Sequence, residues 1–214
     1  MPYNKNMKHE RKRLFIGKNT GSKERLKLIT LALENGCDTL VFSLDDAFFK
    51  SKIRNQKYIK LAKKFALNIE AGGHDLPLLM PKRLFLFNRN LFRMVQGKRV
   101  GAIHFCPTNP KTISIISERA NRLFSRAIQW VTTPRIFHLL PEKGHENTWC
   151  QCPACRAFRP SEQYLIAVNA TADILARFDS SARLLYVEFD TEPEAARIKP
   201  RPNTLIGQTL SAPA

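Results

Sequence analysis

The chain has 214 residues, of which 43% are hydrophobic and 25% are charged, and its formal net charge is +17. This composition is ordinary for a globular protein, and the length allows one domain or at most two. No apolar run reaches the ~18 residues of a membrane span, and the polar, basic amino terminus lacks the apolar stretch of a signal peptide. We therefore expect a cytoplasmic protein with no membrane partner.

The positive charge is concentrated in the amino-terminal half. Residues 1–100 contain 22 Lys and Arg against 8 Asp and Glu, whereas residues 101–214 contain 13 against 10. Clustered Lys and Arg bind phosphates, so nucleic-acid binding through this half is one hypothesis. A solvated basic face is favoured over it, because no motif of stacking aromatic residues accompanies the charge. Residues 1–12 are predicted to be a flexible basic arm before a single domain over residues 13–214.

Short apolar runs alternate with amphipathic segments along this domain. Strands are expected near residues 39–44, 67–70, 101–105, 135–140, 184–189 and 204–208, with a short seventh candidate at 13–17. Helices are expected between them; one begins at Asn109-Pro110, where Asn is a good N-cap and Pro suits the first helical position. Strands that alternate with helices indicate βαβ units and a parallel sheet.

No glycine-rich phosphate-binding loop follows any of the expected strands, which disfavours a nucleotide-binding sheet. The alternative arrangement of parallel βα units is the (β/α)8 barrel, which usually needs about 250 residues. We therefore predict an α/β fold, an incomplete (β/α)8 (TIM-type) barrel with about six parallel strands, truncated at its carboxyl-terminal end. An open sheet edge invites pairing, so self-association is also expected.

Several motifs follow one another in an order that resembles a known family. They are Asp45-Asp46, Glu70-Ala-Gly-Gly-His74, Gly97-Lys-Arg-Val100, Cys106-Pro-Thr-Asn-Pro110 and Cys150-Gln-Cys-Pro-Ala-Cys155-Arg156. Over about residues 30–214 the chain resembles a bacterial glycosidase-like barrel, a domain of unknown function in polysaccharide-degrading proteins that is related in shape to α-glucuronidases and hexosaminidases. The resemblance implies a carbohydrate-active, glycoside hydrolase-like domain that binds an oligosaccharide or polysaccharide and is either active or catalytically degenerate. The chain departs from that family at residues 142–146, where an Asn-Asp pair would stand.

Hydrolysis of a glycoside usually needs two carboxyl groups that face each other across the sugar. Glu142 and Glu188 follow successive predicted strands, so we predict that they form a catalytic pair, although a single loop carboxylate is more often merely solvated. The other residues expected to bind substrate at the strand ends are Asp46, His74, Asp75, His104, Trp149 and Asp190. His104 and His138 lie within apolar runs, where a histidine is more often a core residue.

The loop after residue 140 carries three cysteines at short spacing, Cys150, Cys152 and Cys155. Thiolate and imidazole ligands in tetrahedral geometry suit zinc, and His145 would supply the fourth ligand. In the alternative interpretation these small side chains only pack the loop against Trp149. Zinc is the one cofactor that the sequence suggests. A second functional hypothesis joins these features as a basic nucleic-acid-binding protein with a zinc-stabilised cysteine loop.

Overall fold

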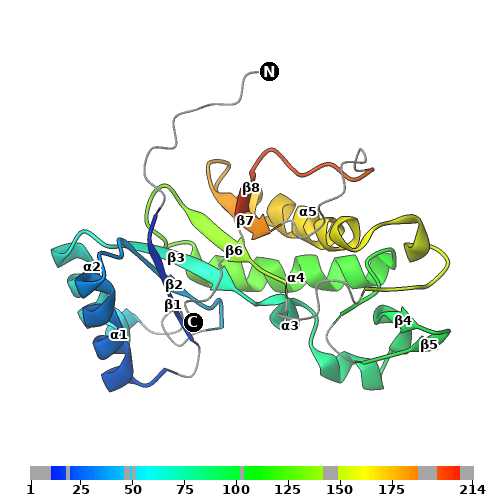
Figure 1. Cartoon of the computed structure of the whole chain (residues 1–214), viewed down its shortest axis with the longest axis horizontal. Coiled ribbons are helices and arrows are strands. Elements are labelled where there is room, and N and C mark those ends of the chain that lie inside the picture. Colours follow the sequence, from blue (N-terminus) through cyan, green and yellow to red (C-terminus); the bar gives the residue numbers. More distant parts are fainter. Residues whose placement is uncertain are drawn as a thin grey trace.

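The computed structural model describes residues 11–17, 20–45, 49, 52–101, 104–141, 149–187 and 197–207. Six strands form one sheet in the order β1-β2-β3-β6-β7-β8, and all of its pairings are parallel (Figure 1). The strands are β1 (Arg13–Ile16), β2 (Thr39–Phe42), β3 (Asn68–Gly73), β6 (Ile136–Leu139), β7 (Arg183–Val187) and β8 (Thr204–Gly207). The predicted parallel α/β sheet of about six strands is confirmed.

The strand order explains why the fold is a partial barrel and not a doubly wound sheet. Each strand of the sheet pairs with the preceding one, and the order never reverses. Because parallel crossovers are right-handed, a sheet without reversal carries its helices on one face. The longer helices are α1 (Ser22–Glu34), α2 (Lys52–Lys64), α4 (Pro110–Ala127) and α5 (Pro160–Phe178). The opposite face of the sheet therefore corresponds to a barrel interior.

Side-chain alternation along the strands separates the two faces of the sheet. Leu40 and Phe42 of β2 and Ile69 and Ala71 of β3 belong to the main hydrophobic core, together with helical residues such as Ile29. Successive strand residues point to opposite faces, so Glu70 lies on the interior face. The predicted start of α4 is also confirmed: the Asn109 side chain accepts a hydrogen bond from Lys111 N, with Pro110 in the first turn.

The segment between β3 and α4 differs from the prediction of a sheet strand over residues 101–105. Residues 102–103 lie outside the described residues, and Phe105 forms only an isolated antiparallel bridge with Phe92. The segment between β3 and α4 forms an excursion from the sheet, within which Cys106 N donates to Leu91 O. β3 therefore pairs directly with β6. The sheet still has six strands, because the short candidate at residues 13–17 forms the edge strand β1. The excursion contains α3 (Leu76–Leu79), η2 (Lys82–Leu86), η3 (Arg89–Leu91), β4 (Met94–Val95) and β5 (Lys98–Arg99).

Gly72 allows β3 and β6 to approach closely on the interior face. It pairs with His138 and has φ +121°, a backbone conformation that L side chains rarely adopt. A Cβ atom at this position would lie 1.9 Å from the carbonyl oxygen of His138. Only glycine therefore fits at this position, because a Cβ atom would meet the backbone of His138.

Among the described parts of the chain, we find no helix with the length and apolar character that a membrane span requires.

Candidate functional site

A buried ionic cluster occupies the interior face of the sheet around Glu70. Its carboxylate is fully buried and accepts hydrogen bonds from Arg11 Nη1 at 2.7 Å, Arg13 Nε at 2.8 Å and His138 Nε2 at 2.6 Å. Burial alone would raise the pKa of Glu70, but the hydrogen bonds from His138 and Arg13 and the charge of Arg13 outweigh it and lower this pKa to about 2. Glu70 is therefore ionised at neutral pH and cannot serve as a proton donor.

His138 stands beside this carboxylate as a neutral imidazole. Burial lowers its pKa despite the hydrogen bond with Glu70. The Nε2–H group therefore donates to Glu70, which leaves Nδ1 as an acceptor. Nδ1 is buried and has no hydrogen-bond partner among the described residues, and Phe15 packs edge-on against the ring at 5.5 Å. Glu70 thus fixes the tautomer and orientation of His138.

The loops at the carboxyl ends of β2, β3 and β6 are tied together by two predicted site residues, His74 and Asp75. The carboxylate of Asp75 is buried and accepts hydrogen bonds from Ser43 Oγ at 2.8 Å and Leu44 N at 2.9 Å, both just after β2. Burial raises the pKa of Asp75. His74 is exposed, and its Nδ1 contacts the carbonyl oxygen of Pro141 beyond β6. These two side chains therefore lie at one edge of the sheet.

His104 and Trp149, two more predicted substrate-binding residues, contact each other in the interior of the domain. Their rings stack with centroids 4.3 Å apart, and both side chains are buried. Phe105 and Tyr164 pack against the same indole. Unlike the exposed His74, the His104–Trp149 pair is therefore part of the interior. It packs the loop before α5 onto the core.

The remaining predicted residues at the strand ends are Asp46, Glu142, His145, Glu188 and Asp190, all outside the described residues. The described chain before Glu142 ends at Pro141, and that before Glu188 ends at Val187. The two positions therefore come just after the ends of β6 and β7, which are paired in the sheet. The catalytic pair stays a prediction.

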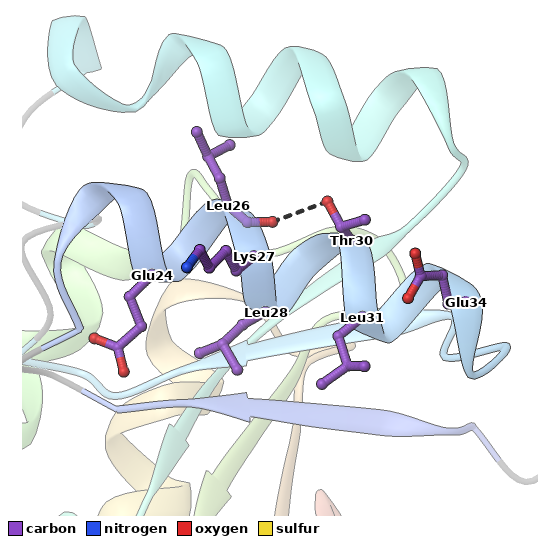
Figure 2. A pocket seen from close by; sticks show the side chains of 7 residues that line it. All are labelled: Glu24, Leu26, Lys27, Leu28, Thr30, Leu31 and Glu34. Atoms are coloured by element: carbon purple, nitrogen blue, oxygen red, sulfur yellow. Dashed lines mark hydrogen bonds between the residues drawn. The ribbon is translucent and has the colours of Figure 1, made fainter.

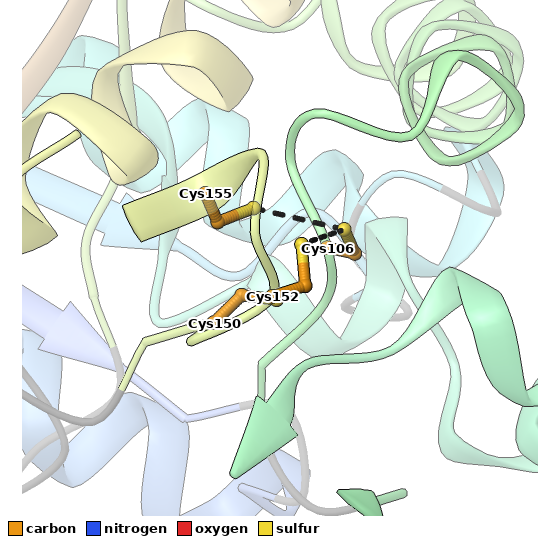
Figure 3. Close-up of side chains that lie close together, drawn as sticks. All are labelled: Cys106, Cys150, Cys152 and Cys155. Atoms are coloured by element: carbon orange, nitrogen blue, oxygen red, sulfur yellow. Dashed lines mark hydrogen bonds between the residues drawn. The ribbon is translucent and has the colours of Figure 1, made fainter. Parts of the chain in front are cut away.

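Four cysteines converge where the loops before α4 and α5 meet (Figure 3). The sulfurs of Cys106, Cys150, Cys152 and Cys155 all lie within 4.8 Å of one another, and all four residues are buried. Cys106 Sγ is 3.7 Å from the sulfurs of both Cys152 and Cys155, and all four thiols are free. The predicted triplet therefore converges, and Cys106 joins it.

Sequence reasoning missed Cys106 because it considered only ligands within one loop. The signal was its place ahead of the helix that begins at Pro110, in the βα unit next to the Cys150 loop. Loops that follow neighbouring parallel strands emerge at the same sheet edge, which brings distant cysteines together. His145, the predicted fourth ligand, lies outside the described residues.

Hydrogen-bond donors surround the sulfur cluster. Met94 N donates to Cys150 Sγ at 3.3 Å, and Arg99 Nη1 lies 3.7 Å from the same sulfur. Thr108 Oγ1 lies 3.1 Å from Cys155 Sγ. Hydrogen bonds with Cys150 and Cys155 lower the pKa of the Cys106 thiol. Hydrogen bonds with Cys106 in turn raise the pKa values of the Cys150 and Cys155 thiols.

The side chain of Gln163, on α5, holds the cysteine loop from the other side. Its Oε1 accepts from Cys150 N at 3.0 Å, while Nε2 donates to the carbonyl oxygens of Cys150 at 3.1 Å and Cys155 at 3.2 Å. Gln163 is itself buried. The loop backbone is therefore fixed independently of the sulfurs.

An open hollow on α1 is a separate feature (Figure 2). Its lining comes from this one helix and includes the exposed side chains of Leu26 and Leu31. The hollow has no part in the strand-end site, because α1 packs on the helical face of the sheet. The lining residues are Glu24, Leu26, Lys27, Leu28, Thr30, Leu31 and Glu34.

No protein-family model matches the chain, and no curated protein matches it. A structure of the tandem GH20 catalytic modules of the pneumococcal exo-β-D-N-acetylglucosaminidase StrH matches with a TM-score of 0.59 at 9% identity, over 92% of this chain and 58% of that one. A second StrH structure, described in terms of N-glycan recognition and hydrolysis, matches with a TM-score of 0.58 at 10% identity over the same shares.

D-psicose 3-epimerase from Clostridium cellulolyticum H10 matches with a TM-score of 0.39 at 12% identity, over 82% of this chain and 63% of that one. The chain spans less than two thirds of the length of the two StrH structures. At 9–10% sequence identity, this structural similarity shows a shared fold. The chain has the fold of a glycosidase-like (β/α) barrel, of which six strands are described here.

Proposed function

We propose that this chain is a glycoside hydrolase-like module that binds a saccharide at the carboxyl ends of its strands. The observation that carries the proposal is the junction of three strand ends at His74 and Asp75, within a fold similar to that of the StrH modules. Barrel enzymes place their sites at this face, where loops from several strands meet. The exposed imidazole of His74 suits hydrogen bonding to the hydroxyl groups of a sugar, while the buried carboxylate of Asp75 fixes the loop beside it.

The register of β6 and β7 supports the proposed pair of Glu142 and Glu188. In the register of these strands His138 is opposite Leu185, so Leu140 comes opposite Val187. The two segments that follow the strands therefore leave the sheet side by side. Neighbouring strands lie about 4.8 Å apart. Retaining glycosidases hold their two carboxyl groups about 5 Å apart, and inverting ones hold them further apart. In this proposal Asp46 and Asp190 bind sugar hydroxyls beside the pair.

Nucleic-acid binding has less support than saccharide binding. Two cations of the basic amino-terminal half, Arg11 and Arg13, turn inward and bind Glu70, so they are engaged within the fold. The structures with a similar fold are described by sugar chemistry. Binding of DNA or RNA that falls steeply with salt concentration, with no saccharide bound, would favour the nucleic-acid alternative.

Saccharide binding is tested by calorimetric titration with chitooligosaccharides, an N-glycan and uronides. We expect at least one of these to bind, and His74→Ala to weaken its binding about tenfold, because one hydrogen-bonding group and one loop contact are lost. The matched control is Asp173→Asn on α5, whose carboxylate bonds Arg201 at an exposed site. Binding that is absent from the whole panel, or equal in both variants, would contradict the proposed site.

We also propose self-association through an open edge of the sheet. Among the described residues the sheet ends with β1 and β8, and Ile206 of β8 is 58% exposed. Unpaired strand edges pair with other chains unless charge or bulk blocks them. Sedimentation should therefore show a dimer or larger species, and Ile206→Lys should shift it toward monomer. A monodisperse monomer of the unmodified chain would exclude this edge contact.

A further inference from the structure

We propose that Cys106, Cys150, Cys152 and Cys155 bind one structural zinc ion as four thiolate ligands. The inference does not depend on the saccharide site. It begins from convergence: four buried sulfurs from two separate βα loops lie within 4.8 Å of one another. The separations of 3.7 Å from Cys106 to Cys152 and to Cys155 are far longer than a disulfide bond of about 2.05 Å.

The sulfur separations match those of a tetrahedral zinc centre. Zinc–sulfur bonds of about 2.3 Å at tetrahedral angles place neighbouring sulfurs about 3.8 Å apart. The distances from Cys106 Sγ to Cys152 Sγ and Cys155 Sγ, both 3.7 Å, agree with that value. A multinuclear iron–sulfur cluster would hold its cysteine sulfurs further apart, around several irons. The spacing therefore fits a single ion.

The charge around the sulfurs also fits a metal centre. Four thiolates around Zn²⁺ carry a net charge of about −2, which hydrogen-bond donors from the surrounding protein must stabilise. Arg99 directs Nη1 to Cys150 Sγ, and Met94 N donates to the same sulfur. Four neutral thiols would be poor acceptors for a guanidinium. Met94 also packs against the cluster, which closes it with an apolar side chain.

The site would be structural, because its ligands complete the coordination shell. Four protein ligands leave no open position for water or substrate, and all four cysteines are buried. The ion would join the loop before α4 to the loop before α5, two helices that pack against each other. Three of its ligands belong to the short Cys-x-Cys-x-x-Cys segment, and Cys106 is the one that joins the two loops (Figure 3).

The experiment measures metal content and ligand identity in the full chain purified under reducing conditions. We expect about one zinc per chain, and X-ray absorption at the zinc edge should show four sulfurs at about 2.3 Å. Removing the ion with a chelator should lower the thermal midpoint, since binding is linked to folding. Zinc far below one equivalent, iron in its place, or a nitrogen ligand in the first shell would overturn the proposal.

Three variants separate this ligand set from the one expected from the sequence. Cys106→Ser should lose most of the bound zinc, whereas His145→Ala should retain it. Cys37→Ser is the matched control, because Cys37 is a free cysteine outside the cluster and should leave the zinc content unchanged. Retention in Cys106→Ser with loss in His145→Ala would overturn the assignment of Cys106. Should Cys106→Ser fail to fold, the absorption spectrum of the unmodified chain still decides the ligand set.

Discussion

Glu70→Gln is expected to lower the free energy of unfolding by about 3 kcal/mol at neutral pH. The substitution removes the charge that compensates Arg11 and Arg13 on the interior face, and breaking a buried ion pair costs about 3–5 kcal/mol. The lowered pKa of Glu70 leads to a similar value, since a fall from 4.5 to about 2 corresponds to about 3 kcal/mol. Denaturant unfolding monitored by circular dichroism measures the difference.

The same ion pair predicts acid lability. A carboxyl group whose pKa is lower in the folded state stabilises the fold above its unfolded pKa, so this contribution is lost as pH falls from 4.5 toward 2. His138 acts in the same direction below pH 6.5, because its lowered pKa keeps it neutral in the folded chain while the unfolded imidazole binds a proton. Glu70→Gln should flatten the part of the stability profile below pH 4.5.

The control for Glu70 is an ion pair at the surface. Asp173 and Arg201 are each about half exposed, so Asp173→Asn should cost less than about 1 kcal/mol. If Glu70→Gln were no more costly than Asp173→Asn, the interior cluster would not stabilise the fold.

Glu142→Gln is expected to lower the rate of glycoside hydrolysis about 10²–10⁴-fold, which is the contribution of general acid–base catalysis. The amide keeps the shape of the side chain but neither donates nor accepts a proton in the reaction. A panel of fluorogenic glycosides and uronides measures the rate, and Glu188→Gln should produce a comparable loss if the two carboxylates act as a pair. The affinity for the intact saccharide should change far less than the rate.

Asp173→Asn again serves as the matched acid-to-amide control, and its hydrolysis rate should equal that of the unmodified chain. A chain that binds saccharide but hydrolyses no member of the panel would contradict the catalytic pair and leave the binding site intact. Loss of hydrolysis in Glu142→Gln together with loss of binding would assign Glu142 to binding instead of catalysis.

Local patterns predicted most of the sheet, because buried parallel strands are continuous apolar runs. The run that became β2 and the helix start at Asn109-Pro110 were predicted from neighbouring residues alone. Residues 101–105 have the same apolar character, yet Phe105 bridges Phe92. Strand propensity does not specify which strand will be the pairing partner. Here Phe105 pairs with Phe92 of the excursion and not with a strand of the sheet.

The candidate site was predictable only where its contacts are local. The cysteine triplet was recognised because its members lie within six residues of the sequence. Cys106 is 46 residues from Cys152, and Arg13 is 57 residues from Glu70, so only the folded topology brings these partners together. The ionic cluster around Glu70 was missed for this reason, since Glu70 by itself is one charge in an apolar strand.

The hydrogen bonds of His74 and Asp75 have a thermodynamic consequence for any ligand at the strand ends. Asp75 is held by Ser43 and Leu44, and His74 is held by Pro141, so both side chains are fixed before a ligand arrives. Freezing a mobile side chain on binding costs about 0.5–1.5 kcal/mol in conformational entropy. Because the carboxylate of Asp75 is buried, a ligand at this edge would contact His74 and would avoid that cost once.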